Sequence, residues 1–171
     1  MPQQKIDKTM SERQRRIFDF IKSNQTGVLA SVDPNGDPHA TVIYHTIDKH
    51  DFSISFLTKD HTKKYDNIIR NNHVVLVIYD ASTQTVAQVI GKAKEIKNHD
   101  EINKIAASIN AASLAETKYD VVPIAKLKAG NYTAFRIQPV QIRMAIYSQP
   151  RSGDYQDLFE TVESFELKTD Y

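Results

Sequence analysis

Residues 58–64, whose sequence is Thr-Lys-Asp-His-Thr-Lys-Lys, contain the side chains best suited to binding chemistry. The sequence pattern predicts that a strand ends and a helix begins here. Lys63 and Lys64 then fall in the first helical turn, where the helix dipole disfavours cations by about 0.3–1 kcal/mol each. A bound anion would remove this conflict, because free N–H groups, two ammonium groups and the hydroxyls of Thr58 and Thr62 suit a phosphate. The other interpretation is a pair of solvated surface lysines, and this segment alone leaves both open.

The remaining reactive side chains follow no catalytic or metal-binding motif. The chain has no Cys, and its six histidines show no His-x-x-x-His or His-Glu-x-x-His spacing, so no zinc site is expected. A role for His45 as an axial ligand stays open beside a structural one. Gly-x-Ser-x-Gly, the Walker loop and Gly-x-Gly-x-x-Gly are also missing. No catalytic residue is assigned, and a bound cofactor would have to supply any difficult chemistry.

Length and charge narrow the class of protein. The chain has 171 residues, the length of one domain, and 22 Lys and Arg against 21 Asp and Glu give a net charge of +1. This balance argues against sequence-blind nucleic-acid binding. No apolar run approaches the roughly 20 residues that span a bilayer. The polar N-terminus has no apolar signal region, so we expect a cytoplasmic protein.

Hydrophobic periodicity predicts a mainly β protein. Six strands joined mostly by hairpins, with helices between some of them, indicate one antiparallel barrel with helices packed outside. Helices are predicted at 11–22, 60–70 and 100–113, and strands at 27–32, 39–47, 52–57, 74–79, 84–96 and 132–146. As a single domain, 1–171 divides into a barrel core at 11–97, a helical insertion at 98–130, a closing strand at 131–147 and a tail at 148–171.

Several local patterns refine these elements. Ser11 and Gln14 form a capping-box pattern, and Asn35-Gly36 is a hairpin turn signal. The strand at 52–57 alternates as if one face were drier, whereas the apolar run at 74–79 predicts burial on both faces. Gly91 predicts a bulge or a close approach of two backbones.

The strand at 39–47 carries polar or aromatic side chains on both faces, so neither face is predicted to be simple core. It is interpreted either as an edge strand at the rim of the barrel or as a binding strand. Its two faces are Thr41, Ile43 and His45 on one side and Val42, Tyr44 and Thr46 on the other.

Six short motifs follow one another in the order of a known family. They are Gly-Val-Leu-Ala-Ser-Val at 27–32, Asn-Gly-Asp-Pro at 35–38, Phe-Leu-Thr at 56–58, Lys-Lys-Tyr-Asp-Asn-Ile at 63–68, Asn-His-Val at 72–74 and Val-Ile-Gly-Lys-Ala at 89–93. Together they resemble the pyridoxamine 5′-phosphate oxidase-like, FMN-binding split-barrel proteins, with the general-stress-protein branch the most similar. The resemblance covers about residues 14–97 in order, and 132–142 loosely.

This resemblance implies a six-stranded split-barrel homodimer with two FMN sites at the subunit interface. The strand at 41–46 would run beside the flavin ring, and the strand end with the lysine pair would hold the ribityl phosphate. A residue near Val86 or Gln88 would reach the cofactor from the same sheet or from the partner. The implied cofactor-binding residues are Thr41, Val42, Ile43, Tyr44, His45, Leu57, Thr58, Lys63, Lys64 and Gln88.

The chain departs from the phosphate oxidases at positions that matter. Those enzymes have Arg where Thr41 stands and Arg-Lys where Lys63-Lys64 stands, and their C-terminal substrate segment contains a Trp, of which this chain has none. A vitamin B6 substrate is therefore not expected. The resemblance implies a flavin-dependent oxidoreductase acting on a small molecule. The alternative is a non-enzymatic carrier or stress protein that binds flavin, deazaflavin or haem.

Overall fold

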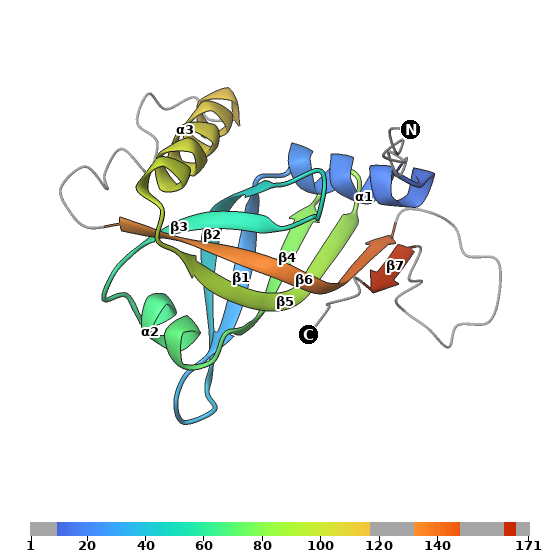
Figure 1. Cartoon of the computed structure of the whole chain (residues 1–171). Coiled ribbons are helices and arrows are strands. Elements are labelled where there is room, and N and C mark those ends of the chain that lie inside the picture. Colours follow the sequence, from blue (N-terminus) through green and yellow to red (C-terminus); the bar gives the residue numbers. More distant parts are fainter. Residues whose placement is uncertain (1–9, 117–131, 148–162, 167–171) are drawn as a thin grey trace, which may run out of the picture.

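A computed structural model of the chain describes residues 10–116, 132–147 and 163–166 (Figure 1). Six strands run in the order β3-β2-β1-β4-β5-β6, and a further pairing of β3 with β6 closes them into an antiparallel barrel, which confirms the predicted fold class. A short strand, β7, extends the sheet beside β6. The helices are α1 (Glu12–Ser23), α2 (Lys63–Arg70) and α3 (His99–Glu116), and the strands are β1 (Thr26–Val32), β2 (Pro38–Ile47), β3 (Ile54–Lys59), β4 (His73–Asp80), β5 (Thr85–Ile96), β6 (Tyr132–Ile146) and β7 (Glu163–Glu166).

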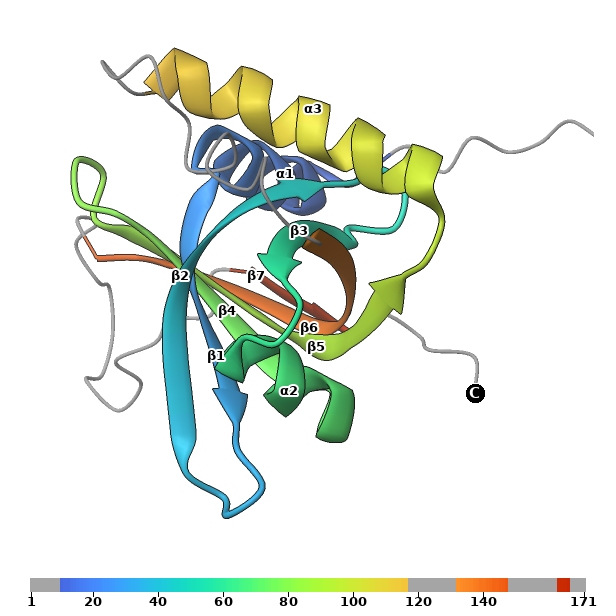
Figure 2. The same ribbon diagram turned by 90° about the vertical axis from the view of Figure 1, so that its left-hand side faces the viewer.

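Helices α1 and α2 lie at opposite ends of the barrel (Figures 1 and 2). Helix α1 begins with the predicted capping box, in which the Ser11 hydroxyl accepts from the Gln14 N–H and the Gln14 side chain accepts from the Ser11 N–H. Its buried face joins the barrel core, where the Phe18 ring meets the Phe52 ring edge-on at 6.1 Å between centroids. The apolar face of α1, formed by Ile17, Phe18 and Ile21, therefore covers one end of the barrel.

The barrel interior is filled with side chains, as expected for this strand count. The rings of Phe56 and Phe135, on the neighbouring strands β3 and β6, stack with their centroids 5.7 Å apart and are fully buried. The Ile43 and His45 side chains also belong to this interior, with 3% and 0% of their surfaces exposed. The expectation that neither face of β2 is simple core is therefore wrong. The edge-strand interpretation is confirmed for Pro38–Tyr44, which pairs with β1 alone, and is wrong for His45–Ile47, which pairs with β3.

Gly91 marks a β-bulge, as its position in the sequence predicts. The register between β5 and β6 shifts between Ile90 and Gly91, where one residue of β6 has no partner. A Cβ atom on Gly91 would lie 2.4 Å from the carbonyl oxygen of Gln138, a distance that excludes any side chain without a backbone shift. The bulge lets the long strand β6 bend near Pro139 and continue along β5.

Three predicted elements differ in detail from the structure. Strand β3 begins two residues later than expected and is buried on both faces, because α3 covers the side that alternation suggested was wetter. Strand β4 is buried on one face only within this chain, where Tyr79 on the other face is 56% exposed. Helix α2 begins at Lys63 rather than residue 60, because His61 adopts a positive φ of 59° and Thr62 caps the helix.

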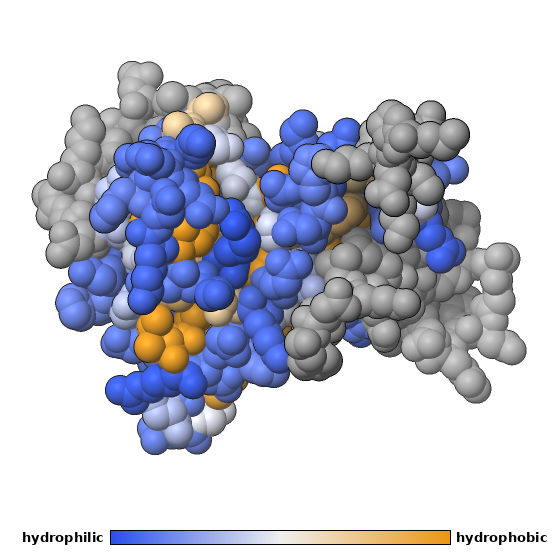
Figure 3. All heavy atoms as spheres, viewed as in Figure 1, coloured by the Kyte–Doolittle hydropathy of each residue, from blue (hydrophilic) through white to orange (hydrophobic). Residues whose placement is uncertain are grey.

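Helix α3 lies across the outer face of β2, β3 and β6 (Figure 2). Its buried isoleucines form a second, smaller core with side chains from the strands beneath: Leu57, Ile96, Ile102, Ile105, Ile109 and Ala134. The face of the molecule drawn in Figure 3 is mostly hydrophilic, with an apolar patch over α2, the helix that carries the exposed Ile69. Among the described helices, none is long and apolar enough to cross a membrane. The ambiguous segment at 116–130 lies almost wholly outside the described residues, and so does most of the tail.

Candidate functional site

The end of β3 and the start of α2 form a compact group of hydroxyls. The Thr58 and Thr62 hydroxyl oxygens lie 3.2 Å apart, and the Thr62 hydroxyl donates to the Lys59 carbonyl at 3.0 Å. The Thr62 oxygen also accepts from the Tyr65 N–H at 3.3 Å, which caps α2. The first N–H groups of a helix have no intrahelical acceptor, so this end of α2 presents free donors beside two hydroxyls.

Lys64 is the cation that this group leaves uncompensated. Its side chain is half-buried, with Nζ 5.8 Å from the centroid of the Phe56 ring at the end of the barrel. Burial lowers the pKa of the Lys64 ammonium below its usual value, because desolvation disfavours the charged form. No described carboxylate lies within ion-pair distance of Lys64. A half-buried ammonium without a counter-ion is the feature that a bound anion would complete.

Lys63 points to a different part of the molecule. Its Nζ lies 3.9 Å from a carboxylate oxygen of Asp33, and its side chain is 60% exposed. Asp33 organises the β1–β2 hairpin, since its carboxylate accepts from the N–H groups of Asn35 and Asp37. The backbone N–H of Asp37 is the main cause that lowers the pKa of Asp33, and Lys63 contributes less. The structure therefore separates two lysines that the sequence presents as a pair.

A polar group on the adjacent strands lies close to α2. A Glu95 carboxylate oxygen on β5 accepts from the Thr133 hydroxyl on β6 at 3.1 Å and from the Tyr65 hydroxyl on α2 at 3.4 Å. Burial, followed by the negative charge of Glu95, raises the pKa of the Tyr65 phenol. Thr133 is the direct cross-strand neighbour of Thr58. Sequence reasoning missed this group because its members come from three separate elements.

The predicted cofactor-binding residues of β2 divide between its two faces. Val42 and Tyr44 point outward, and Val42 is 61% exposed. Ile43 and His45 point into the core, so only their backbone atoms are available to a ligand outside the barrel. Burial lowers the pKa of His45 to about 4, and neither ring nitrogen makes a hydrogen bond of good geometry within the described part of the chain. Thr41 lies half-buried towards one end of the same strand.

Two further predicted residues lie away from Lys64. Leu57 is buried beneath α3 and is 9% exposed. Gln88, on β5, lies opposite Val77 of β4, which in turn lies opposite Val28 of β1. These registers place Gln88 on the outer face of the sheet, beside an apolar row that also includes Val42. Among the described residues, no three His, Cys, Asp or Glu side chains come close enough to hold a metal ion.

Comparisons with known proteins agree with this architecture. A family model described as pyridoxamine 5′-phosphate oxidase matches residues 14–145. No curated protein sequence matches the chain. The crystal structure of the conserved hypothetical protein Rv2991 from Mycobacterium tuberculosis superposes with a TM-score of 0.66 and 23% identity, over 90% of this chain and 97% of that chain.

Two further solved structures share the fold. A pyridoxamine 5′-phosphate oxidase-related, FMN binding protein from Nostoc punctiforme has a TM-score of 0.58 and 16% identity, over 81% of this chain and 86% of that chain. The general stress protein 26 of Bacillus anthracis has a TM-score of 0.58 and 21% identity, over 76% of this chain and 91% of that chain. The family model spans most of the chain, from α1 to the end of the closing strand β6. The chain therefore belongs to the pyridoxamine 5′-phosphate oxidase family.

Proposed function

We propose that this protein binds FMN and that Lys64, with the hydroxyls of Thr58 and Thr62, holds its phosphate. The observation that carries this proposal is the half-buried Lys64 ammonium, which has no carboxylate partner among the described residues and belongs to the first turn of the helix that Thr62 caps. A phosphate would supply the missing negative charge and accept hydrogen bonds from the Lys64 ammonium and the free N–H groups of the helix start, and from the two hydroxyls once their protons turn away from the Lys59 carbonyl. The name of the Nostoc punctiforme relative, an FMN binding protein, gives independent support.

The rest of the cofactor is proposed to lie along β2. The Thr41–His45 stretch would present its backbone to the flavin ring, with Val42 and Tyr44 pointing outward beside it. Val42 is one of a row of outward-facing valines, with Val28 as its cross-strand neighbour and Val77 on the next strand. A second copy of the chain would cover this row, because water-exposed apolar side chains in a contiguous row favour association. Such a dimer would also bring Gln88, on the same face, to the subunit interface.

The activity proposed is that of a flavin-dependent oxidoreductase acting on a small molecule. When bound, the flavin supplies the hydride chemistry. The chain's own residues bind and orient the cofactor, and the buried face of β2 gives that strand a rigid base. His45 is fully buried in the core, which argues against the haem alternative with this residue as axial ligand.

The phosphate contact is tested by comparing FMN with riboflavin, which lacks the phosphate. We expect the unmodified protein to bind FMN at least tenfold more tightly than riboflavin, because a charge-assisted contact contributes about 1.5–3 kcal/mol. Lys64→Gln should reduce this preference about tenfold. Lys63→Gln is the matched control and should leave it nearly unchanged, because Lys63 is exposed and faces Asp33. An undiminished preference for FMN in Lys64→Gln would refute the proposed phosphate contact.

The oxidoreductase proposal needs a separate measurement. Bleaching of the flavin absorbance by NADH or NADPH, with recovery in air, would support turnover. A flavin that stays oxidised with both donors would favour the carrier alternative. Mass spectrometry of the molecule that copurifies distinguishes FMN from a deazaflavin.

A further inference from the structure

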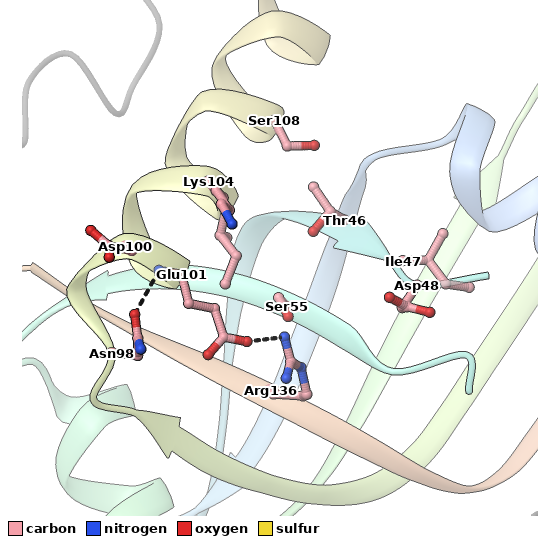
Figure 4. A pocket seen from close by; sticks show the side chains of 11 residues that line it. Thr46, Ile47, Asp48, Ser55, Asn98, Asp100, Glu101, Lys104, Ser108 and Arg136 are labelled. Carbon is pink, nitrogen blue, oxygen red and sulfur yellow. Dashed lines mark hydrogen bonds and ion pairs between the residues drawn. The ribbon is translucent and has the colours of Figure 1, made fainter. Parts of the chain in front are cut away.

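A second polar site lies between α3 and the barrel, at the end of β2 remote from Lys64. It is an open groove of about 620 Å³ beneath the first half of α3 (Figure 4). Strands β2, β3 and β6 form its floor, and Figure 4 shows Lys104 and Ser108 on the helix side. Its lining is Thr46, Ile47, Asp48, Ser55, Asn98, Asp100, Glu101, Lys104, Ile105, Ser108 and Arg136.

The floor of the groove is a polar row that crosses three strands. Thr46 of β2 lies opposite Ser55 of β3, and Ser55 lies opposite Arg136 of β6. Two residues further along these strands, the equivalent row contains Leu57 and Ala134, which are buried under α3. The sheet face beneath α3 therefore changes from apolar to polar between these two rows.

Three acidic side chains line the groove, and among the described residues Glu101 is the one that is paired with a cation. Glu101 accepts from Arg136 at 2.6 Å, in an ion pair that links α3 to β6 (Figure 4). The Asp48 carboxylate accepts from the His50 N–H at 2.7 Å. Asp100 stands in the first turn of α3, where the helix dipole favours a carboxylate.

The donors of the groove are mostly free. The Lys104 ammonium makes no ion pair with any described carboxylate. The hydroxyls of Thr46, Ser55 and Ser108 form no hydrogen bond within the described part of the chain, although Ser55 is only 5% exposed. The groove therefore offers one exposed ammonium group and three hydroxyl groups as donors to a ligand.

From this arrangement we infer that the groove binds a small organic acid that has one carboxylate and at least one hydroxyl group. The Lys104 ammonium pairs with the carboxylate, and the Thr46, Ser55 and Ser108 hydroxyls bond to the hydroxylated part. A phosphate dianion fits less well, because Asp48 and Asp100 line the same groove and repel a second negative charge. The role of this acid as the substrate rests on the proposed function, because Thr46 belongs to the strand proposed to run beside the flavin. Binding of the acid does not depend on it.

The inference is tested by titrating the full-length protein, as purified, with sodium glycerate and following backbone amide shifts by NMR. We expect saturable shifts at Thr46, Ser55 and Ser108. Lys104→Gln should weaken glycerate binding about tenfold. Lys97→Gln removes an exposed lysine outside the groove and should leave binding unchanged.

Parallel titrations with acetate and inorganic phosphate examine the ligand class. Acetate should bind more weakly than glycerate, because it has no hydroxyl group, and phosphate should bind more weakly than both. The inference is overturned if glycerate produces no saturable shifts, if phosphate binds as tightly as glycerate, or if Lys104→Gln binds glycerate normally. The preference for FMN over riboflavin separates this test from the earlier one, since Lys104→Gln should keep the preference that Lys64→Gln weakens.

Discussion

Protonation of His45 should destabilise the barrel as the pH falls. The ring is 0% exposed, and neither nitrogen makes a hydrogen bond of good geometry with a described residue. Burial disfavours the imidazolium and lowers the pKa of His45 from 6.5 to about 4, although the nearby Asn24 backbone carbonyl favours the charged form slightly. The unfolded chain exposes the same ring to water, where its pKa returns to about 6.5.

The size of the effect follows from proton linkage. Between pH 6.5 and pH 4 the unfolded chain binds more protons at His45 than the folded protein does, so the free energy of unfolding falls as the pH falls. Each pKa unit is worth about 1.36 kcal/mol, so the complete loss below pH 4 is about 3.4 kcal/mol. Between pH 7.5 and pH 5 the expected loss is about 2 kcal/mol. A loss of this size is a large part of the stability of an ordinary domain.

Urea denaturation at pH 7.5 and pH 5.0, followed by far-ultraviolet circular dichroism, measures this loss. His45→Leu is the comparison, because it keeps an apolar side chain in the core and removes the titrating group. The carboxylates and the other histidines titrate alike in both proteins. The difference in pH dependence between the unmodified protein and His45→Leu therefore isolates the contribution of His45. We expect the variant to lose about 2 kcal/mol less than the unmodified protein. Equal losses would refute the assignment of a depressed pKa to this buried ring.

Two further predictions concern the bulge and the outer face of the sheet. Gly91→Ala should lower the free energy of unfolding by about 1–3 kcal/mol, because the added Cβ meets the Gln138 carbonyl oxygen at 2.4 Å. Urea denaturation measures this loss. An unchanged midpoint would contradict the prediction and would mean that the two backbones can separate at no cost. Val42→Lys should convert the proposed dimer to a monomer, because it places a charge in the exposed valine row. Sedimentation velocity distinguishes the two states, and a dimer that persists would exclude this face as the interface.

The strand and helix types could be predicted because each element has a consistent local pattern. The period of α1 and the capping box at Ser11 carry enough information by themselves, and so does the lone Gly91 within a strand run. The errors arise where distant segments decide burial. Strand β3 is covered on its second face by α3, which begins about forty residues later, so its alternation was misleading. The last strand, β7, is short and pairs only with β6, so it had no distinct pattern.

The candidate site was predictable only in part. Thr58 and Thr62 are near one another in the chain, and their hydroxyl oxygens do lie together, 3.2 Å apart; that Lys64 shares a phosphate site with them stays a prediction. The divergence of Lys63 depends on Asp33, which reaches it from a hairpin thirty residues upstream. The groove under α3 was missed because its floor comes from three strands and its wall from a helix. Arg136 and Arg143 are the charged residues of β6, and nothing in the sequence distinguishes Arg136, which lines the groove, from Arg143.

Strand β6 has a consequence for how the chain reaches its native state. It pairs with β3 and β5 along the barrel, and its partner for Ile54 is Ile137, far along the chain. During synthesis on the ribosome, β3 and β5 therefore each lack their pairing with β6, and the barrel stays open until β6 emerges. Contacts of such long sequence separation slow folding and leave apolar surface accessible to chaperones or to aggregation. A nascent chain arrested before residue 132 should consequently be far more sensitive to protease than one released at full length.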